Sequence, residues 1–177
     1  MKKVLEIGAG VDYYKGQKDE KVIYLDNARL PHIDIVHDLN KYPYPFKDNE
    51  FDKIICSHVL EHVNDLDKTL KELKRISKRG AIIKIFGPHF SCGVSYRDPT
   101  HRRLFSYFTF DYFTKECFYA PVIFNIQFRR LNFTRQAFTF LNYIINPLIN
   151  ISPLIYERFF CWILPCAEVH CDLKVVK

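Results

Sequence analysis

The sequence predicts an α/β fold: an open, doubly wound, mostly parallel sheet. Short apolar runs alternate with helical or loop segments, and a glycine turn follows the first run. A helix is expected between the fourth and fifth runs, which gives the order of a parallel strand, helix, strand unit. The apolar character of the runs predicts strands that are buried on both faces.

The length and composition fit one globular domain over residues 1–177. The chain is 48% hydrophobic, which provides enough apolar side chains for one core and too few residues for two domains. Charged residues make up 26% of the chain and the net charge is +6. The surface is therefore mildly basic and favours anionic partners only weakly.

Five strands are expected in the first half of the chain, followed by two more. The first five are residues 3–7, 21–25, 33–36, 51–57 and 81–86. Later, apolar and polar residues alternate over 124–129, and the chain closes on an apolar run within 170–177. The sheet should therefore have about seven strands.

The clearest helix follows the fourth strand. Asn64 can cap its first turn, with Asp67 three residues later. One apolar stripe at helical spacing runs through Leu66, Leu70, Leu73 and Ile76. Gly80 is expected to end the helix.

The turn after the first strand is shaped for a nucleoside. Gly8 and Gly10 allow the backbone to turn sharply and approach a ligand, and Asp26 ends the next strand where it can bind ribose hydroxyls. A dinucleotide fingerprint would need a third glycine where Tyr13 stands. Residues 11–17 also look like a loop, so pyrophosphate binding is not expected.

Three segments together resemble the class I S-adenosylmethionine-dependent methyltransferases. They are "VLEIGAG", Asp38-Leu39 after the third strand, and "FKDNEFDKIICSHVLEHV" around the fourth. The resemblance implies a Rossmann-like methyltransferase fold whose last strand is antiparallel. It also implies S-adenosylmethionine as cofactor, bound by residues 1–90, with the acceptor bound by residues 91–177, which carry an aromatic and apolar insertion at about 134–166.

The resemblance also implies roles for individual residues. The cofactor-binding set is Glu6, Gly8, Ala9, Gly10, Asp26, Asp38, Leu39, Ser57 and His58. Within it, Glu6 would orient the amino group of the methionine part, Asp26 would bind the ribose and Asp38 the adenine amino group. A sulfonium cation without a pyrophosphate suits carboxylates at strand ends. The alternative is that these three acids are merely solvated strand-end residues.

The segment "HVLEH" also fits a zinc-hydrolase pattern, in which both histidines share one helical face. His58 directly follows a strand, so His58 and His62 need not share a helix turn. We therefore predict no metal here. His58 is expected to face the cofactor, and Glu61 or His62 to face the acceptor or to cap a loop.

Residues 87–113 are expected to bind the acceptor at the same end of the sheet. A hydroxyl acceptor needs a base, and the predicted catalytic residues are His101, His89 and Asp98, with Asp98 orienting the ring of His101. Two alternatives stay open. "DPTH" can be a structural turn, and these three residues could instead bind a divalent metal.

"PH…DPTHRRLFS" and the C-terminal "ERFFCWILPCAEVHCDLKVVK" resemble methyltransferases of polysaccharide biosynthesis. This resemblance implies O-methylation of a sugar, a glycan or another small-molecule hydroxyl. An RNA methyltransferase that uses residues 102–135 is the second hypothesis, although arginines are few there. A non-catalytic interaction protein that keeps the fold is the third. The acceptor, O- versus N-methylation and the oligomeric state are not determined by the sequence.

Residues 137–156 contain no charged residue. Three asparagines and two prolines interrupt them, and a membrane span would separate the last strand from its sheet. They either cover the core or form a surface that contacts a membrane or another subunit. The six cysteines lack a C-x-x-C pair and Met1 leads directly into a strand, so we expect a cytoplasmic protein, with peripheral contact at the inner face of the membrane as an option.

Overall fold

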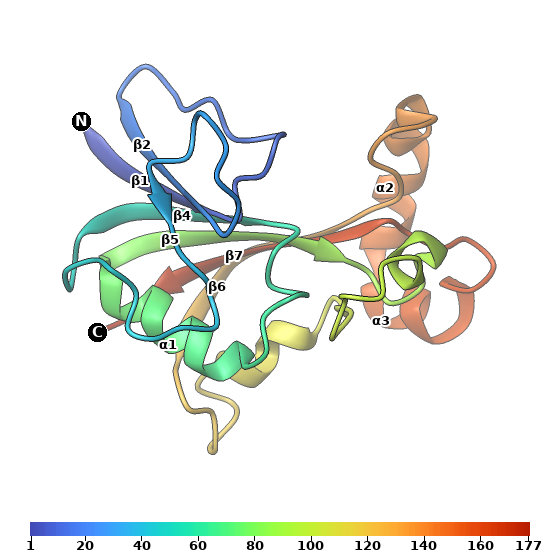
Figure 1. The fold of residues 1–177 in the computed structure, drawn as a ribbon. Coiled ribbons are helices and arrows are strands. Elements are labelled where there is room, and N and C mark those ends of the chain that lie inside the picture. The colour runs from blue at the N-terminus through green and yellow to red at the C-terminus, as the bar shows by residue number, and fades with distance from the viewer.

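The computed structural model describes residues 1–177 as one seven-stranded sheet in the order β3-β2-β1-β4-β5-β7-β6 (Figure 1). The strands are β1 (Lys2–Ile7), β2 (Glu20–Asp26), β3 (Ile35–Val36), β4 (Phe51–Ser57), β5 (Ser77–Pro88), β6 (Phe124–Asn132) and β7 (Glu168–Val175). The first five pair in parallel, and β7 is antiparallel to both of its neighbours, β5 and β6. The predicted fold class is confirmed, including the antiparallel last strand.

Helix α1 (Leu66–Ile76) is the expected one, but both of its ends differ from the prediction. Asp65, not Asn64, is the N-cap, because its side chain accepts a hydrogen bond from the backbone N–H of Lys68. The helix ends at Ser77, whose hydroxyl donates to the carbonyl of Leu73. Gly80 lies within β5, with a φ of +80°.

The hydrophobic core lies on one face of the sheet. On β5, Ile83 and Ile85 are buried in the core, whereas the alternate residue Lys84 points to the other face and pairs with Asp172 of β7. Helix α1 lies against one side of the sheet (Figure 1). Burial on both faces was therefore the wrong prediction for β5, because the chain provides no helix to cover its second face.

The connection from β1 to β2 is a loop over residues 8–19, as expected. The backbone N–H of Tyr14 donates to the Glu6 carboxylate at 2.7 Å. The ring of Tyr13 stacks on His32, with centroids 4.0 Å apart. These contacts fix the position of the loop, which stands where a helix would otherwise follow β1.

The helices of the second half lie beyond the end of β5, except the one over residues 109–113, which lies on the same side of the sheet as α1 (Figure 1). They are α2 (Asn142–Ile151), α3 (Pro153–Ile155) and the π-helix η4 (Tyr156–Phe160), with short 3₁₀-helices η1 (Gly93–Tyr96), η2 (Thr109–Phe113) and η3 (Thr139–Leu141). No helix is long and apolar enough to cross a membrane.

Three asparagines of helix α2, spaced four residues apart, hold the helix against the backbone at the end of β6. The side-chain oxygens of Asn142, Asn146 and Asn150 accept hydrogen bonds from the backbone N–H groups of Thr134, Phe133 and Leu131. The opposite side of α2 is open to solvent, with Tyr143 86% and Ile151 79% exposed. Of the two alternatives for residues 137–156, the structure thus favours the exposed surface.

Candidate active site

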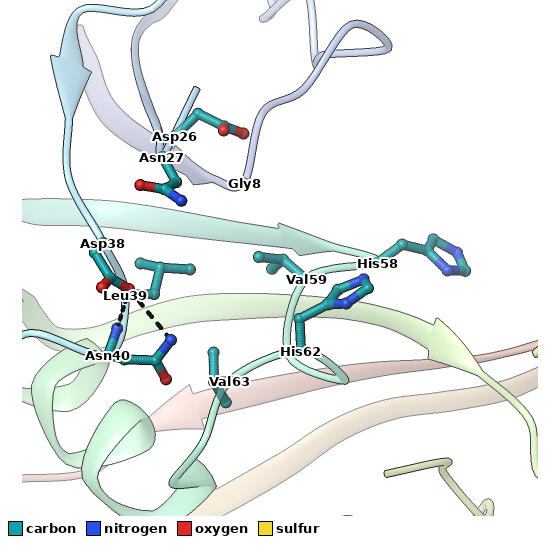
Figure 2. Close-up of a pocket in the computed structure, with 10 residues that line it drawn as sticks. All are labelled: Gly8, Asp26, Asn27, Asp38, Leu39, Asn40, His58, Val59, His62 and Val63. Carbon is teal, nitrogen blue, oxygen red and sulfur yellow. Dashed lines mark hydrogen bonds between the residues drawn. The ribbon is translucent and has the colours of Figure 1, made fainter. Parts of the chain in front are cut away.

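A cleft of about 310 Å³ opens where β1, β2 and β4 end (Figure 2). It is lined by Gly8, Asp26, Asn27, Asp38, Leu39, Asn40, His58, Val59, His62 and Val63. Five of the predicted cofactor-binding residues are among these, namely Gly8, Asp26, Asp38, Leu39 and His58. The carboxyl ends of neighbouring parallel strands are where open α/β sheets bind ligands.

Asp26 stands at the end of β2 and shapes the turn beside the cleft. Its Oδ2 accepts from the backbone N–H of Gly10 at 3.0 Å, and its Oδ1 accepts from that of Ala28 at 2.7 Å. Each carboxylate oxygen has a second lone pair for a ligand. Asp26 is therefore both fixed in position and able to accept further hydrogen bonds.

Asp38 lies across the cleft from Asp26 (Figure 2). Its Oδ1 accepts from the backbone N–H and the side-chain amide of Asn40, and the backbone bond is the main cause that lowers the pKa of Asp38. Leu39 and Val63 are buried and give this side of the cleft an apolar wall. A carboxylate beside an apolar wall can hold a flat heterocycle with an exocyclic amine.

Four predicted cofactor residues do not line the cleft: Glu6, Ala9, Gly10 and Ser57. Glu6 is buried, which raises its pKa, and its carboxylate binds the backbone of Tyr14. Glu6 thus holds the loop after β1. Gly10 acts indirectly, through its hydrogen bond to Asp26.

The two glycines of the turn are needed for different reasons. Both have positive φ, +65° at Gly8 and +50° at Gly10. A Cβ on Gly8 would lie 2.3 Å from Cγ2 of Val59, whereas one on Gly10 would meet no atom closer than 3.9 Å. Gly8 therefore allows β1 to approach the segment after β4, and Gly10 leaves open space.

His58 connects the cleft with strand β7. Its backbone is left-handed, with φ +50°, and its Nε2 lies 2.9 Å from Oε2 of Glu168 on β7. Burial lowers the pKa of His58, but the bond to Glu168 and the nearby Glu61 outweigh burial and raise it. Glu168 also accepts from the amide of Asn132 and lies 3.5 Å from Arg135. Sequence reasoning missed Glu168, since 110 residues separate it from His58.

A second pocket of about 310 Å³ adjoins the first at His58, which lines both. Its walls are His58, Pro88, Cys92, Val94, Ser95, His101, Thr134, Arg135, Gln136, Ala137 and Ala167. His101 is thus the predicted catalytic residue that reaches the site. Residues 134–137 fall within the predicted acceptor-binding half, 91–177, but were not predicted individually, and only their place after β6 could have indicated them.

The structure keeps Asp98 at ion-pair distance from His101 but places His89 apart from both pockets. His101 Nδ1 lies 2.7 Å from the carbonyl oxygen of Ser95, so Nδ1 is the donor and Nε2 is free. Asp98 is exposed, accepts from the N–H and hydroxyl of Thr100, and stays 3.8 Å from His101 Nε2. This is the structural turn kept as an alternative for "DPTH".

His89 is fully buried and its two ring nitrogens contact Ser91 and Glu157. It lines neither pocket. The alternative metal group of His89, Asp98 and His101 is therefore not assembled.

"HVLEH" forms a turn, not a helix: the backbone N–H of His62 donates to the carbonyl of Val59. The helical zinc-hydrolase pattern is thus not formed, as expected. His62 lines the cleft, and Glu61 is completely buried.

Comparison with known proteins shows similarity to methyltransferases. Residues 5–85 match the family model of a methyltransferase domain. An uncharacterised protein of Methanocaldococcus jannaschii is 39% identical over 95 residues, which cover 46% of this chain and 39% of that protein. The matched segment thus spans well under half the length of this curated relative.

Solved structures extend the likeness over nearly the whole chain. A SAM-dependent methyltransferase from Archaeoglobus fulgidus gives a TM-score of 0.68 at 18% identity, covering 98% of this chain and 86% of that one. Another from Aquifex aeolicus gives 0.58 at 14% identity, covering 99% and 82%. The resemblance expected from the sequence is confirmed for the fold and for the domain type of residues 5–85.

Proposed function

Since the fold is that of class I methyltransferases and residues 5–85 match a methyltransferase domain, we propose that the chain is an S-adenosylmethionine-dependent methyltransferase. It acts on a hydroxyl of a sugar, a glycan or another small molecule. The observation that carries this proposal is the pair of adjoining pockets that share His58. One has the polarity of a nucleoside site, and the other can hold an acceptor within reach of it.

The residues of the first cleft fit S-adenosylmethionine. Asp26 has free lone pairs for a ribose diol, and Asp38 beside Leu39 suits an adenine ring with its amino group. Because Glu6 is buried against Tyr14, orienting the methionine amino group falls to other residues of the cleft.

The cofactor supplies an electrophilic methyl group on a sulfonium sulfur, which keeps the electron pair of the broken C–S bond. His101 Nε2 would take the acceptor proton as the oxygen bonds to the methyl carbon. The carbonyl of Ser95 fixes the tautomer that leaves Nε2 unprotonated. His58 and residues 134–137 would hold the acceptor in line with the cleft.

A sugar-type acceptor is supported by the lining of the second pocket. Thr134, Arg135 and Gln136 provide hydrogen-bond donors and acceptors, and Ala137 and Val94 provide small apolar contacts. This mixture suits a polyhydroxylated ring. The looser resemblance to methyltransferases of polysaccharide biosynthesis points the same way.

Calorimetry with S-adenosylmethionine tests the proposal. Asp26→Ala should weaken binding by about 1–3 kcal/mol, the usual cost of losing a charged hydrogen-bond partner. His101→Ala should bind the cofactor like the wild type but lower turnover about 100-fold with any acceptor found by screening sugars and nucleotide sugars. No cofactor binding by the wild type, or full affinity in Asp26→Ala, would contradict the proposed site.

We also propose that the protein works in the cytoplasm, at the inner face of the membrane. The segment 138–163 exposes twelve large apolar side chains: Phe138, Phe140, Tyr143, Ile144, Leu148, Ile151, Leu154, Ile155, Phe159, Phe160, Trp162 and Ile163. We call this the apolar surface. Its charged companions are Arg135, Arg158 and Glu157, and Glu157 is tied to Ser106 and Tyr107. Aromatic and aliphatic groups flanked by arginine match an anionic lipid surface.

A further inference from the structure

The carboxylate of Glu61 is buried without hydrogen bonds. Its side chain is completely buried, and neither carboxylate oxygen has a hydrogen-bond partner. Nδ1 of His58 lies 3.4 Å from Oε1 and forms an ion pair with it when the ring is protonated, but no group donates a hydrogen bond to either oxygen. Buried carboxylate oxygens nearly always accept hydrogen bonds or bind a metal, so two oxygens without a donor leave room for a further ligand.

Two imidazoles stand next to this carboxylate. One donor atom each from Glu61, His62 and His101 lies within 4.8 Å of the other two. His101 Nδ1 is engaged with the carbonyl of Ser95, and His62 Nδ1 with the hydroxyl of Thr100. Each ring thus keeps its Nε2 for a ligand. The hydrogen bond from the other ring nitrogen, which commonly orients a metal-binding histidine, is already in place.

We propose that Glu61, His62 and His101 bind a divalent transition-metal ion. Two imidazoles and one carboxylate suit ions such as Zn²⁺, Mn²⁺ or Fe²⁺, whereas Mg²⁺ and Ca²⁺ prefer all-oxygen sites. Three protein ligands leave coordination positions open, as in catalytic metal sites. The ligands come from the turn after β4 and from the loop after η1, so the ion would join two parts of the chain.

The ion also defines the acceptor more closely, and this step rests on the proposed function. His62 lines the cofactor cleft and His101 the second pocket, so the ion sits between them. Its open positions can hold two adjacent oxygens of one acceptor, which selects vicinal diols or hydroxy acids. With the ion bound, Nε2 of His101 would be a metal ligand in place of the base role proposed for it above. The metal would make the acceptor hydroxyl more acidic, so its proton would pass to solvent.

The metal site is tested on the full chain after treatment with a chelator. Zn²⁺ is titrated by calorimetry and Co²⁺ by visible absorption, with the melting temperature measured in parallel. We expect one ion per chain and a rise in melting temperature. Glu61→Gln and His101→Asn should each weaken binding at least tenfold, and His170→Asn, a histidine paired with Asp172 outside the cluster, should bind like the wild type.

Glu61→Gln gives a second readout, the melting temperature. Without the carboxylate, the increase in melting temperature caused by Zn²⁺ should be lost. Absence of binding by the wild type, or wild-type binding by Glu61→Gln, would overturn the inference. Calorimetry with S-adenosylmethionine on the same preparations separates the two proposals, since cofactor binding without metal binding overturns only this one.

Discussion

A single methyl group decides how the chain can pack at the turn after β1. Gly8→Ala should lower the free energy of unfolding by about 2–4 kcal/mol, because the new Cβ meets Val59 and the backbone is left-handed. Gly10→Ala is the matched control, with positive φ but open space, and should cost about 1 kcal/mol. Urea unfolding measures both. Equal losses would show that the contact with Val59 is unimportant.

Residues whose positions depend on local geometry could be predicted from the sequence. Gly8, Asp26 and Asp38 each stand at the end of a strand, and strand ends can be located by apolar runs. His58 also lines the cleft, but its partner Glu168 was not predicted, because pairing across β5 and β7 depends on strand order. Glu6 was placed in the cleft, yet the loop after β1 folds back onto it. Loop conformation is set by such tertiary contacts.

Among the elements, strands and helix α1 were predictable and their ends were less so. The apolar stripe of α1 gives its position, but Asn64 and Asp65 are both good caps, and only the backbone geometry selects Asp65. Helix α2 shows the opposite case. Its three asparagines look unfavourable for a helix, yet at a spacing of four residues they satisfy the backbone that leaves β6.

The π-helix η4 is anchored by Glu157, and this contact should depend on pH. Burial raises the pKa of Glu157, but hydrogen bonds from His89, Ser106 and the backbone of Tyr107 lower it by more than burial raises it. The pKa of Glu157 in the folded protein is therefore below its usual 4.5. A folded-state pKa below the unfolded value means that the stabilisation is complete above about pH 4.5. It is lost as the pH falls through the folded pKa.

Glu157→Gln should therefore lower the free energy of unfolding by about 1–3 kcal/mol at pH 7, and the difference from the wild type should shrink below pH 4.5. Urea unfolding at several pH values measures this difference. Glu116→Gln, at an exposed position, should have no effect at any pH. If the difference in the free energy of unfolding stays constant down to acidic pH, the negative charge of Glu157 does not contribute to stability.

At the scale of the whole molecule, the sheet separates two environments. One face carries the core and α1, and the other carries ion pairs such as Lys53–Glu20 and Lys84–Asp172. The cofactor cleft and the second pocket lie at the ends of the parallel strands, and α2 and α3 extend beyond the same edge (Figure 1). A membrane that met the apolar surface would therefore lie on the side of the molecule where the acceptor is expected to enter.

Flotation with vesicles tests this arrangement. The wild type should bind vesicles rich in phosphatidylglycerol at low salt, and binding should weaken as salt screens Arg135 and Arg158. Full burial of an isoleucine contributes about 1.5–3 kcal/mol, so the double variant Ile151→Gln, Ile163→Gln should lose at least about tenfold in affinity. Phe118→Ser, equally exposed but outside the apolar surface, should bind like the wild type. If the wild type fails to float at low salt while light scattering shows a dimer that the double variant loses, the apolar surface joins two copies of the chain and the lipid proposal is wrong.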